Sequence, residues 1–449
     1  MLVAGTSNAA QSAVTNAPRR RFSSRGIFLY DSRNMLEVES GRRSRRLRKA
    51  FLAGMATMVA VWGLAAAPVT AQTPPEFVGS GTCAACHPDI HERWQETLMA
   101  NVLQDAQADP SVVLGDFTTP NDLVTFTPED VDFTYGSKWK QRYFTRVGDD
   151  YYVFPAQWDV ANRVWRRYYV QEGTDWWASV YPADQMARPT GPLCDGCHST
   201  NYEVETKTPA EWNVGCEKCH GPGSTHTASL APSDIVNPAR LDDVRANDIC
   251  IQCHSQGQPR ENPIAGQYYD WPVGYLPGDQ LADRWMLEEH HLGEETFMHW
   301  PEGSAHKNRM QGNDFVTSLM YRKGVRCSSC HDVHGTDHAA DLVRPGNAVC
   351  TQCHQPSSPL GPRGALAEHT QHAPESAGSQ CVACHMPQLA RTVGDVSVRS
   401  HTFRFITPMM TDQYGVPNAC TTCHTDQTNE WATEALRQWP NVSPWRVAP

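Results

Sequence analysis

Cysteine placement constrains this chain more than any other feature of its sequence. The 449 residues contain 16 cysteines, and every one of them belongs to a Cys-x-x-Cys-His pentapeptide. The eight cysteine pairs are Cys83 and Cys86, Cys194 and Cys197, Cys216 and Cys219, Cys250 and Cys253, Cys327 and Cys330, Cys350 and Cys353, Cys381 and Cys384, and Cys420 and Cys423. The histidines that end the motifs are His87, His198, His220, His254, His331, His354, His385 and His424. The fold must therefore present eight copies of one small chemical unit.

Each motif has the spacing that covalent attachment of haem requires. Two thiols separated by two residues can both bond to the haem vinyl groups, and the next histidine then becomes an axial ligand of the iron. A zinc ribbon needs paired cysteine knuckles instead, and neither zinc nor a disulfide framework requires a histidine after the second cysteine. Eight complete motifs therefore predict eight haem c groups, each with one iron ion.

The second axial ligands are expected among the histidines outside the motifs. The sequence has 19 histidines, so eleven remain. The glycines before His226 allow a sharp turn that brings its imidazole to a neighbouring haem. His334 lies three residues after His331, too close to reach the opposite face of the same iron. The other candidates are His306, His372, His401, His299 and His290. For each, a surface position or a hydrogen bond to a haem propionate is the alternative.

Met99 is a candidate ligand of a different kind, because a thioether would raise the potential of one haem relative to its neighbours. Apolar residues recur every four positions around it, which predicts an amphipathic helix from Ile90 to Asp105. A methionine on such a helix is also a common core residue.

Two regions follow from the motif spacing. Residues 72–190 hold one motif and a predicted hairpin from Lys140 to Phe154, with a turn at Gly148 to Asp150, so we expect a small β-containing insertion there. Residues 191–449 hold the other seven motifs. Irregular spacing and many glycines and prolines predict extensive loops and short helices.

Residues 1–71 have the pattern of an export signal. A basic cluster, Arg42 to Lys49, precedes an apolar run from Ala50 to Ala67 and a small-residue cleavage site ending at Ala71. This predicts a periplasmic or extracellular protein, and an uncleaved membrane anchor is the alternative.

The chain that follows this segment is strongly acidic, with 27 Lys and Arg against 46 Asp and Glu. This charge argues against nucleic-acid binding and favours electrostatic steering of a basic redox partner. It would also simply keep the protein in solution.

Three functions remain open from these residues. Haems with two histidine ligands suit an electron carrier, whose partners would be other cytochromes or a membrane-bound quinol oxidoreductase. A reductase of a small nitrogen or sulfur compound would need one open iron position with acid and cation groups above it, for which His299, His306, Lys307 and Arg309 are candidates. Basic residues also neutralise propionates. The third function is structural: the protein would form a homo-oligomer, such as a conductive filament, or part of an outer-membrane conduit.

Longer stretches around the motifs carry a family resemblance. They are CAACHPDIHERW, CDGCHSTNY, NVGCEKCHGPGSTH, RLDDVRANDICIQCHSQG, HKNRMQGNDFVTSLMYRKGVRCSSCHDVHG, CVACHMP and SHTFRFITPMMTDQYGVPNACTTCHTD. From about Phe77 to Trp431 the chain resembles the multihaem cytochromes of the cytochrome c554-like, doubled-CxxCH group. The resemblance implies a mainly α fold with extensive loops, a multihaem cytochrome c fold organised by stacked haems. It also implies electron transfer in a periplasmic or cell-surface respiratory chain, and His226 and His334 as distal ligands. Met99 stands where such cytochromes often have a histidine.

Overall fold

We describe a computed structural model of the chain over residues 74–168, 189–362, 364–440 and 442–443. Contacts group the residues from Thr73 onward into one compact unit. The predicted export segment, residues 1–71, lies outside the described residues.

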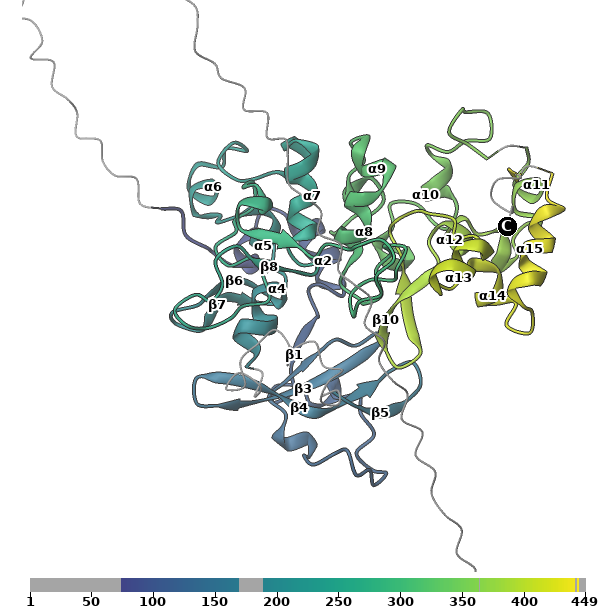
Figure 1. Cartoon of the computed structure of the whole chain (residues 1–449). Coiled ribbons are helices and arrows are strands. Elements are labelled where there is room, and N and C mark those ends of the chain that lie inside the picture. The colour runs from purple at the N-terminus through teal and green to yellow at the C-terminus, as the bar shows by residue number, and fades with distance from the viewer. Residues whose placement is uncertain (1–73, 169–188, 363, 441, 444–449) are drawn as a thin grey trace, which may run out of the picture. The chain divides into compact units, whose positions relative to one another are not determined.

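A five-stranded antiparallel sheet follows the first motif (Figure 1). Its strands pair in chain order and are β1 (Leu103–Asp105), β2 (Phe133–Tyr135), β3 (Lys140–Val147), β4 (Asp150–Asp159) and β5 (Val164–Arg167). The predicted hairpin is present as β3 and β4, with Val147 opposite Asp150 and Gly148 at a φ of 66° in the turn between them. Glycine takes this left-handed conformation without steric cost.

An aromatic core supports this sheet. Tyr143 and Ala156 are fully buried and pack with Phe126, Trp158 and Trp165. The Trp158 and Trp165 rings, which face each other across β4 and β5, meet edge to face with centroids 5.2 Å apart. The aromatic density of residues 140–169 is thus used for packing, at least through Tyr168.

The helix predicted from Ile90 to Asp105 is wrong beyond its first turns. Helix α2 (Pro88–Gln95) ends at Gln95, and Leu103–Asp105 is strand β1. The Asn101 side-chain amide donates to the carbonyls of Gln95 and Thr97, and the Thr97 hydroxyl donates to Trp94. These side chains satisfy the last carbonyls of the helix, so the chain can leave the helical path there.

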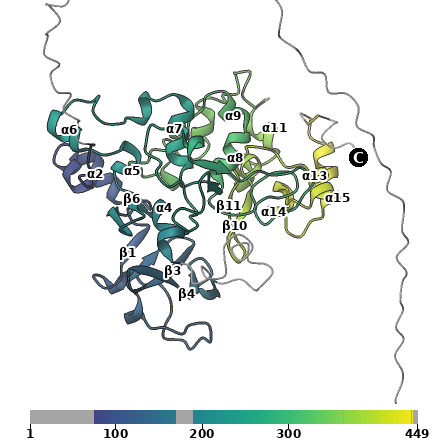
Figure 2. The same ribbon diagram turned by 60° about the vertical axis from the view of Figure 1, so that its left-hand side comes forward.

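Short helices make up much of the rest of the unit, and several of them carry motifs (Figures 1 and 2). None of the helices described exceeds nine residues. They are α1 (Ser80–Ala84), α4 (Gly196–His198), α5 (Glu217–His220), α6 (Ser224–Ser229), α7 (Asp243–Ile251), α8 (Gln311–Thr317), α9 (Leu319–Arg322), α10 (Ala348–Thr351), α11 (Leu366–Thr370), α12 (Cys381–His385), α13 (Pro408–Tyr414), α14 (Ala419–Cys423) and α15 (Asn429–Arg437). Three two-stranded sheets lie among them: β6 (Ser199–Glu203) with β7 (Thr208–Trp212), β8 (Gly257–Pro259) with β9 (Trp285–Leu287), and β10 (Gln388–Val393) with β11 (Val396–Arg399). The extensive loops are as expected, but a mainly α composition is not confirmed.

Polar contacts join the five-stranded sheet to the β10–β11 hairpin. Arg166 donates to the buried Asp159 at 2.7 Å and to Asp395 at 3.3 Å. The Lys140 ammonium donates to the carbonyl of Thr392 at 2.9 Å. The sheet is therefore tied to residues more than 220 positions later in the chain.

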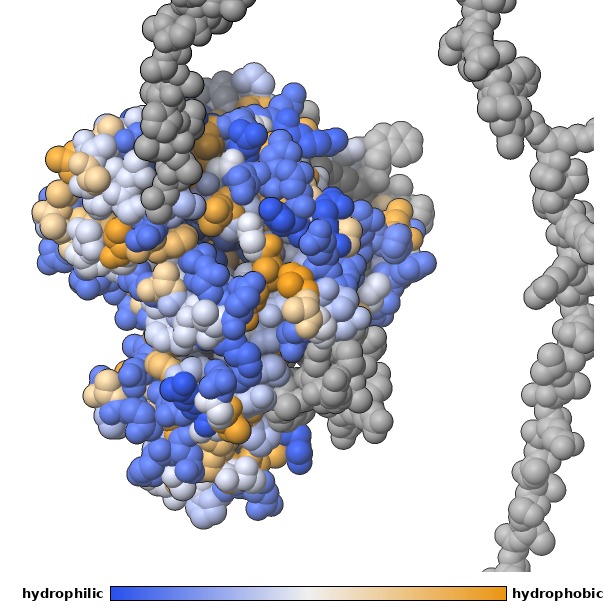
Figure 3. Space-filling view, turned by 90° about the vertical axis from the view of Figure 1, so that its left-hand side faces the viewer, coloured by the Kyte–Doolittle hydropathy of each residue, from blue (hydrophilic) through white to orange (hydrophobic). Residues whose placement is uncertain are grey.

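The buried hydrophobic residues form several small clusters. On the face shown in Figure 3, hydrophilic residues cover most of the surface and hydrophobic ones form scattered patches. Within the described ranges, none of the helices has both the length and the apolar character needed to span a bilayer.

Packing around Gly115 gives a test of the sheet core. A Cβ at this position would lie 2.6 Å from the Trp165 ring and 2.7 Å from the Tyr143 hydroxyl. We expect Gly115→Ala to lower the free energy of unfolding by about 1 to 3 kcal/mol because the core is overpacked. The control is Gly81→Ala, where the added methyl meets nothing within 4 Å. Equal thermal unfolding midpoints for the two variants would contradict this packing.

Candidate haem-attachment sites

Each motif folds as one helical turn. The amide of the motif histidine donates to the carbonyl of the first cysteine, at N···O distances of 2.8 to 3.1 Å, in the motifs that end at His87, His220, His254, His331, His354 and His424. Helices α4 and α12 end at His198 and His385 in the other two. Positions i, i+3 and i+4 of a helix share one face. Both thiols and the imidazole therefore point to the same side, and all 16 thiols are free.

We number these attachment sites 1 to 8 in chain order, from Cys83–His87 (site 1) to Cys420–His424 (site 8).

Backbone oxygens orient several motif imidazoles. His220 Nδ1 lies 2.8 Å from the carbonyl of Val236, and His331 Nδ1 lies 2.8 Å from that of Ala340. His354 Nδ1 is 2.6 Å from the carbonyl of Leu360. A carbonyl can only accept, so Nδ1 must carry the proton, and Nε2 keeps the lone pair that a metal needs.

Three motif histidines face a second histidine at a common separation. Ring centroids lie 6.2 Å apart for His220 and His334, 6.3 Å for His385 and His369, and 6.1 Å for His424 and His372. Two imidazoles on opposite sides of one iron, each with a metal–nitrogen bond of about 2 Å, would hold their centroids roughly 6 Å apart. These pairs therefore leave room for one iron between them, and the residues present fit haem.

The outer histidines of the pairs have anchored rings too. His334 Nδ1 lies 3.1 Å from Asp332 Oδ1, and His372 Nδ1 lies 2.5 Å from the carbonyl of Thr370. His369, the partner of His385, was not among the ligands predicted from the sequence, whereas His372 was. The spacing His369-x-x-His372 puts two imidazoles about one helical turn apart, and this signal could have revealed both.

Two protein families match parts of this chain. The family described as "Doubled CXXCH motif" matches residues 321–358, and "Cytochrome c554 and c-prime" matches residues 174–221. The multiheme cytochrome MtrA of Shewanella baltica is 26% identical over 157 residues, which is 34% of this chain and 45% of that protein. The chain thus matches less than half the length of this curated relative.

The fold has a counterpart among solved structures. The outer cell wall cytochrome OcwA superposes with a TM-score of 0.65 at 23% identity, covering 81% of this chain and 87% of that one. An undecaheme cytochrome from the S-layer of Carboxydothermus ferrireducens gives a TM-score of 0.45 at 18% identity, with 81% and 61% covered. This chain is a multihaem c-type cytochrome. Its CxxCH motifs bind haem c.

Two further predicted ligands of the cytochrome lie near motifs. His226 is on α6, which is fixed to the segment before site 1 by two hydrogen bonds between Ser224 and Glu76. His401 lies close to His331 and His254: burial lowers the pKa of His401 to about 4, and the charges of these two histidines contribute less. His401 Nδ1 faces the carbonyl of Arg399 at 3.1 Å.

The remaining predicted ligands have other recorded neighbours. His290 and His299 face each other with centroids 5.7 Å apart, and the His306 ring packs on Trp300 at 4.4 Å. Both ring nitrogens of His306 are buried without a hydrogen-bond partner. Among the ring contacts of the described residues, none joins these three to a motif histidine. Met99 is half-buried, and its carbonyl accepts from the amide of Val214 at 3.3 Å.

Site 2 has a cationic environment. Burial, followed by the charges of Arg309 and Arg142 and smaller contributions from His254 and Lys140, lowers the pKa of His198 to about 3. Arg309 forms a 3.0 Å ion pair with Asp270, and the Arg142 guanidinium lies 4.4 Å from the Tyr168 ring centroid. His198 Nδ1 is buried without a hydrogen-bond partner. Of the candidates named from sequence, Arg309 is thus placed near a motif.

Sites 4 and 6 share a longer signature, Asn-x-x-Cys-x-Gln-Cys-His, beginning at Asn247 and Asn347. Asn247 Oδ1 accepts from the amide of Cys327 at 2.8 Å, and its amide donates to Val325 at 3.2 Å. Asn347 Oδ1 likewise accepts from the amide of Cys381 at 2.8 Å, and its side-chain amide donates to the carbonyl of Ser379 at 2.9 Å. Each asparagine therefore fixes the first cysteine of the next site.

The glutamines of the same signature reach the preceding site. Gln252 Nε2 donates to the carbonyl of Lys218 in site 3 at 3.3 Å, and Gln352 Nε2 donates to that of Ser329 in site 5 at 3.2 Å. Sequence reasoning missed all four residues, although the repeated signature was visible.

A buried carboxylate anchors site 1 to site 3. Glu217, inside the third motif, is 1% exposed. It accepts from the amides of Val78, Gly79 and Gly223 at 2.7 to 3.0 Å. Ser80 Oγ accepts from the amide of Cys216 at 2.9 Å.

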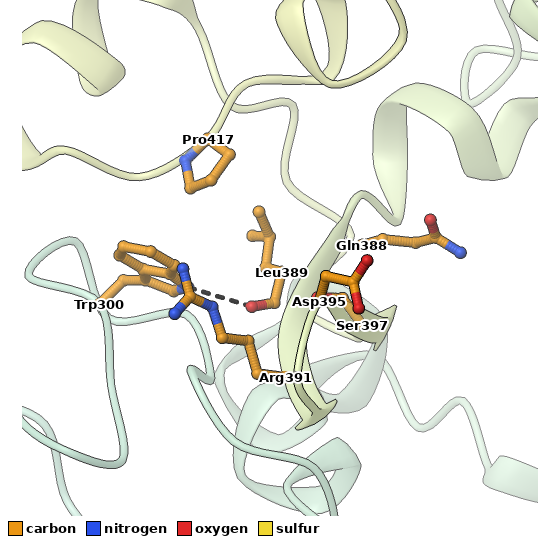
Figure 4. Close-up of a pocket in the computed structure, with 8 residues that line it drawn as sticks. Trp300, Gln388, Leu389, Arg391, Asp395, Ser397 and Pro417 are labelled. Atoms are coloured by element: carbon orange, nitrogen blue, oxygen red, sulfur yellow. Dashed lines mark hydrogen bonds between the residues drawn. The ribbon is translucent and has the colours of Figure 1, made fainter. Parts of the chain in front are cut away.

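A pocket of about 430 Å³ lies apart from the motifs (Figure 4). Trp300 crosses one side and donates from Nε1 to the carbonyl of Leu389 at 3.3 Å, while Arg391, Asp395 and Pro417 complete the wall. No motif residue lines it, so we assign it no part in haem attachment.

The asparagine contacts predict a local loss of stability. Asn347→Ala leaves the Cys381 amide and the Ser379 carbonyl without their partner, and we expect it to cost about 1 to 3 kcal/mol. Thermal unfolding of the haem-loaded protein measures this cost. Gln355→Ala, at an exposed side chain near the same motif, is the control and should change little.

The paired histidines predict a spectroscopic change. Removing the ligand opposite His385, in His369→Ala, should convert one haem from low-spin to high-spin and allow it to bind CO after reduction. EPR of the oxidised protein measures this conversion. His291→Ala, at an exposed histidine, should leave the spectrum unchanged. An unaltered low-spin signal in His369→Ala would exclude His369 as a ligand.

Proposed function

We propose that this cytochrome carries eight haems and passes electrons between redox proteins outside the cytoplasm. The pairing of His220, His385 and His424 with second histidines supports this proposal most. Two histidine ligands close both axial positions of an iron, which favours electron transfer over substrate binding. The eight motifs, all built as the same helical turn, support the count.

Haem supplies a reversible one-electron change when it is bound. The chain's own residues hold and orient it. The thiols of each helical turn fix its edge, and carbonyls such as those of Val236 and Ala340 set the ring plane of the motif histidine. We propose that His226 and His401 complete the ligand sets near sites 1, 4 and 5. The connecting side chains Asn247 and Asn347 keep neighbouring sites in contact.

We place the protein outside the cytoplasm on the strength of the export pattern in residues 1–71. A cytochrome of the same fold is described as an outer cell wall protein. The acidic chain favours basic partners, such as other cytochromes or a membrane-bound quinol oxidoreductase. We further propose that residues 72–190 carry site 1 and the large sheet, and that 191–449 carry the other seven sites.

The haem count has a direct test. Intact mass of the purified protein should exceed the mass of the mature polypeptide by eight haems, because each motif forms two thioether bonds. Cys420→Ala combined with Cys423→Ala should remove one haem. A wild-type increment of fewer than eight would contradict the count.

A second function, reduction of a small anion, is favoured by one observation at site 2. The charges of Arg309 and Arg142 act on His198, and the ring contacts of the described residues show no second histidine facing it. Such cations would attract an anionic ligand. The same cations would also serve to neutralise haem propionates.

The binding of an anionic ligand, compared with that of a neutral ligand, distinguishes attraction of an anionic substrate from neutralisation of haem propionates. If an open iron position exists at site 2, Arg142→Gln should weaken azide binding by about tenfold, as expected for loss of one charge at partial burial, and should leave CO binding unchanged. Arg146→Gln, at an exposed position of the same strand, is the control. The absence of any azide-binding haem would rule out this second function.

A further inference from the structure

We infer that seven of the attachment sites form one line, in the order 1, 3, 4, 5, 6, 7 and 8, and that site 2 is a side branch where sites 3 and 4 meet. This inference rests on the proposed electron-carrier function and gives it a route. It differs from chain order, in which site 2 stands between sites 1 and 3.

Sulfur contacts between motifs report which sites adjoin. The cysteine thiols stand here for the thioether sulfurs of the haem-bound protein, so a contact between two of them marks two neighbouring haem edges. The Cys83 and Cys216 thiols lie side by side, and Ser80 Oγ accepts from the Cys216 amide at 2.9 Å. Sites 1 and 3 are therefore neighbours although site 2 separates them in sequence.

Site 4 connects sites 3 and 5. Its Gln252 binds the carbonyl of Lys218 in site 3, and its Asn247 binds the amide of Cys327 in site 5. The Cys250 and Cys327 thiols, the first sulfurs of sites 4 and 5, lie side by side.

Site 6 repeats this arrangement between sites 5 and 7. Gln352 binds the carbonyl of Ser329 in site 5, and Asn347 binds the amide of Cys381 in site 7. The Cys350 and Cys381 thiols lie side by side. The two connectors thus use the same two side chains for the same two tasks, and the contacts alternate regularly from site 3 to site 7.

Site 8 continues the line from site 7. Helices α12 and α14, which carry the two motifs, are in contact. The Cys384 thiol of site 7 lies near the thiols of Cys420 and Cys423 in site 8. Beyond site 8, the Trp431 ring of α15 lies 4.9 Å from the His424 ring.

Site 2 touches only the junction of sites 3 and 4 among the motif contacts of the described residues. Cys197 Sγ donates to the carbonyl of Gln252, and Cys253 Sγ donates to the carbonyl of Cys197, both at 3.8 Å. The Lys218 ammonium of site 3 donates to the carbonyl of Gly196 at 2.5 Å.

Other parts of the chain cover the remaining sides of site 2. The Trp271 ring lies against Gly196, where a Cβ would come within 1.8 Å of it. Tyr135 of β2 donates a hydrogen bond to Asp195, and its ring lies 4.8 Å from the His198 ring. The large sheet therefore closes the branch on this side.

Two deletions of one haem each should have opposite effects on such a route. Removing site 5 through Cys327→Ala and Cys330→Ala cuts the line between sites 4 and 6. Removing site 2 through Cys194→Ala and Cys197→Ala leaves the line whole. Intact mass confirms that each haem-loaded variant retains seven haems.

The probe is a ruthenium tris-bipyridine label on an engineered cysteine, Glu434→Cys, at an exposed position of α15 beside site 8. Under illumination, a tertiary amine in solution is oxidised and each electron reduces one ferric iron to ferrous. Electron transfer within one chain gives a reduction phase whose rate does not depend on protein concentration. In the variant that lacks site 2, we expect this phase to reduce all seven haems. Without site 5 it should reduce three of seven, those of sites 6, 7 and 8. A partial fast phase without site 2, or a complete one without site 5, would overturn the branched order.

Failure of the proposed function would look different. If even the labelled wild-type protein has no fast phase, the electron-carrier proposal fails rather than the order. A cryo-EM map of the unlabelled haem-loaded protein then decides the order by itself, as it does if a deletion variant does not fold. The inference predicts that the site 2 iron is nearest to those of sites 3 and 4. It is wrong if that iron lies between those of sites 1 and 3.

Discussion

The structure depends on one local constraint, the helical turn that puts two cysteine sulfurs and an imidazole on the same side of the backbone. Eight copies of this turn, rather than one large apolar core, organise the chain. The buried hydrophobic clusters are accordingly small and separate. The polypeptide mainly has to keep each turn short, orient its histidine and hold it against the next turn.

Polar side chains perform much of this task. Asn247 and Asn347 each accept from the first amide of a neighbouring motif and donate to a carbonyl two residues before it. Glu217 accepts from two amides of the segment before site 1. These groups make specific, directional bonds, which fix which site adjoins which. Hydrophobic packing alone would tolerate more than one arrangement.

Sequence reasoning succeeded where the chemistry is local. The cysteine spacing predicts the attachment turns, and the Gly148 turn predicts the β3–β4 hairpin. It failed from Glu96 to Asp105, because side-chain caps end α2 earlier than apolar periodicity suggests. It selected His334 and His372 but not His369, since partners across a haem are set by tertiary structure. The order of the sites was beyond reach for the same reason, although the Asn and Gln of sites 4 and 6 marked the connectors.

The central claim is that one chain holds eight one-electron centres and returns every electron it accepts. A coulometric reductive titration of the purified haem-loaded protein, followed by reoxidation with a small ferric cytochrome c, tests this claim most directly. The account predicts eight electrons taken up per chain and the same number returned. Uptake of fewer than eight, or a return smaller than the uptake, would contradict it.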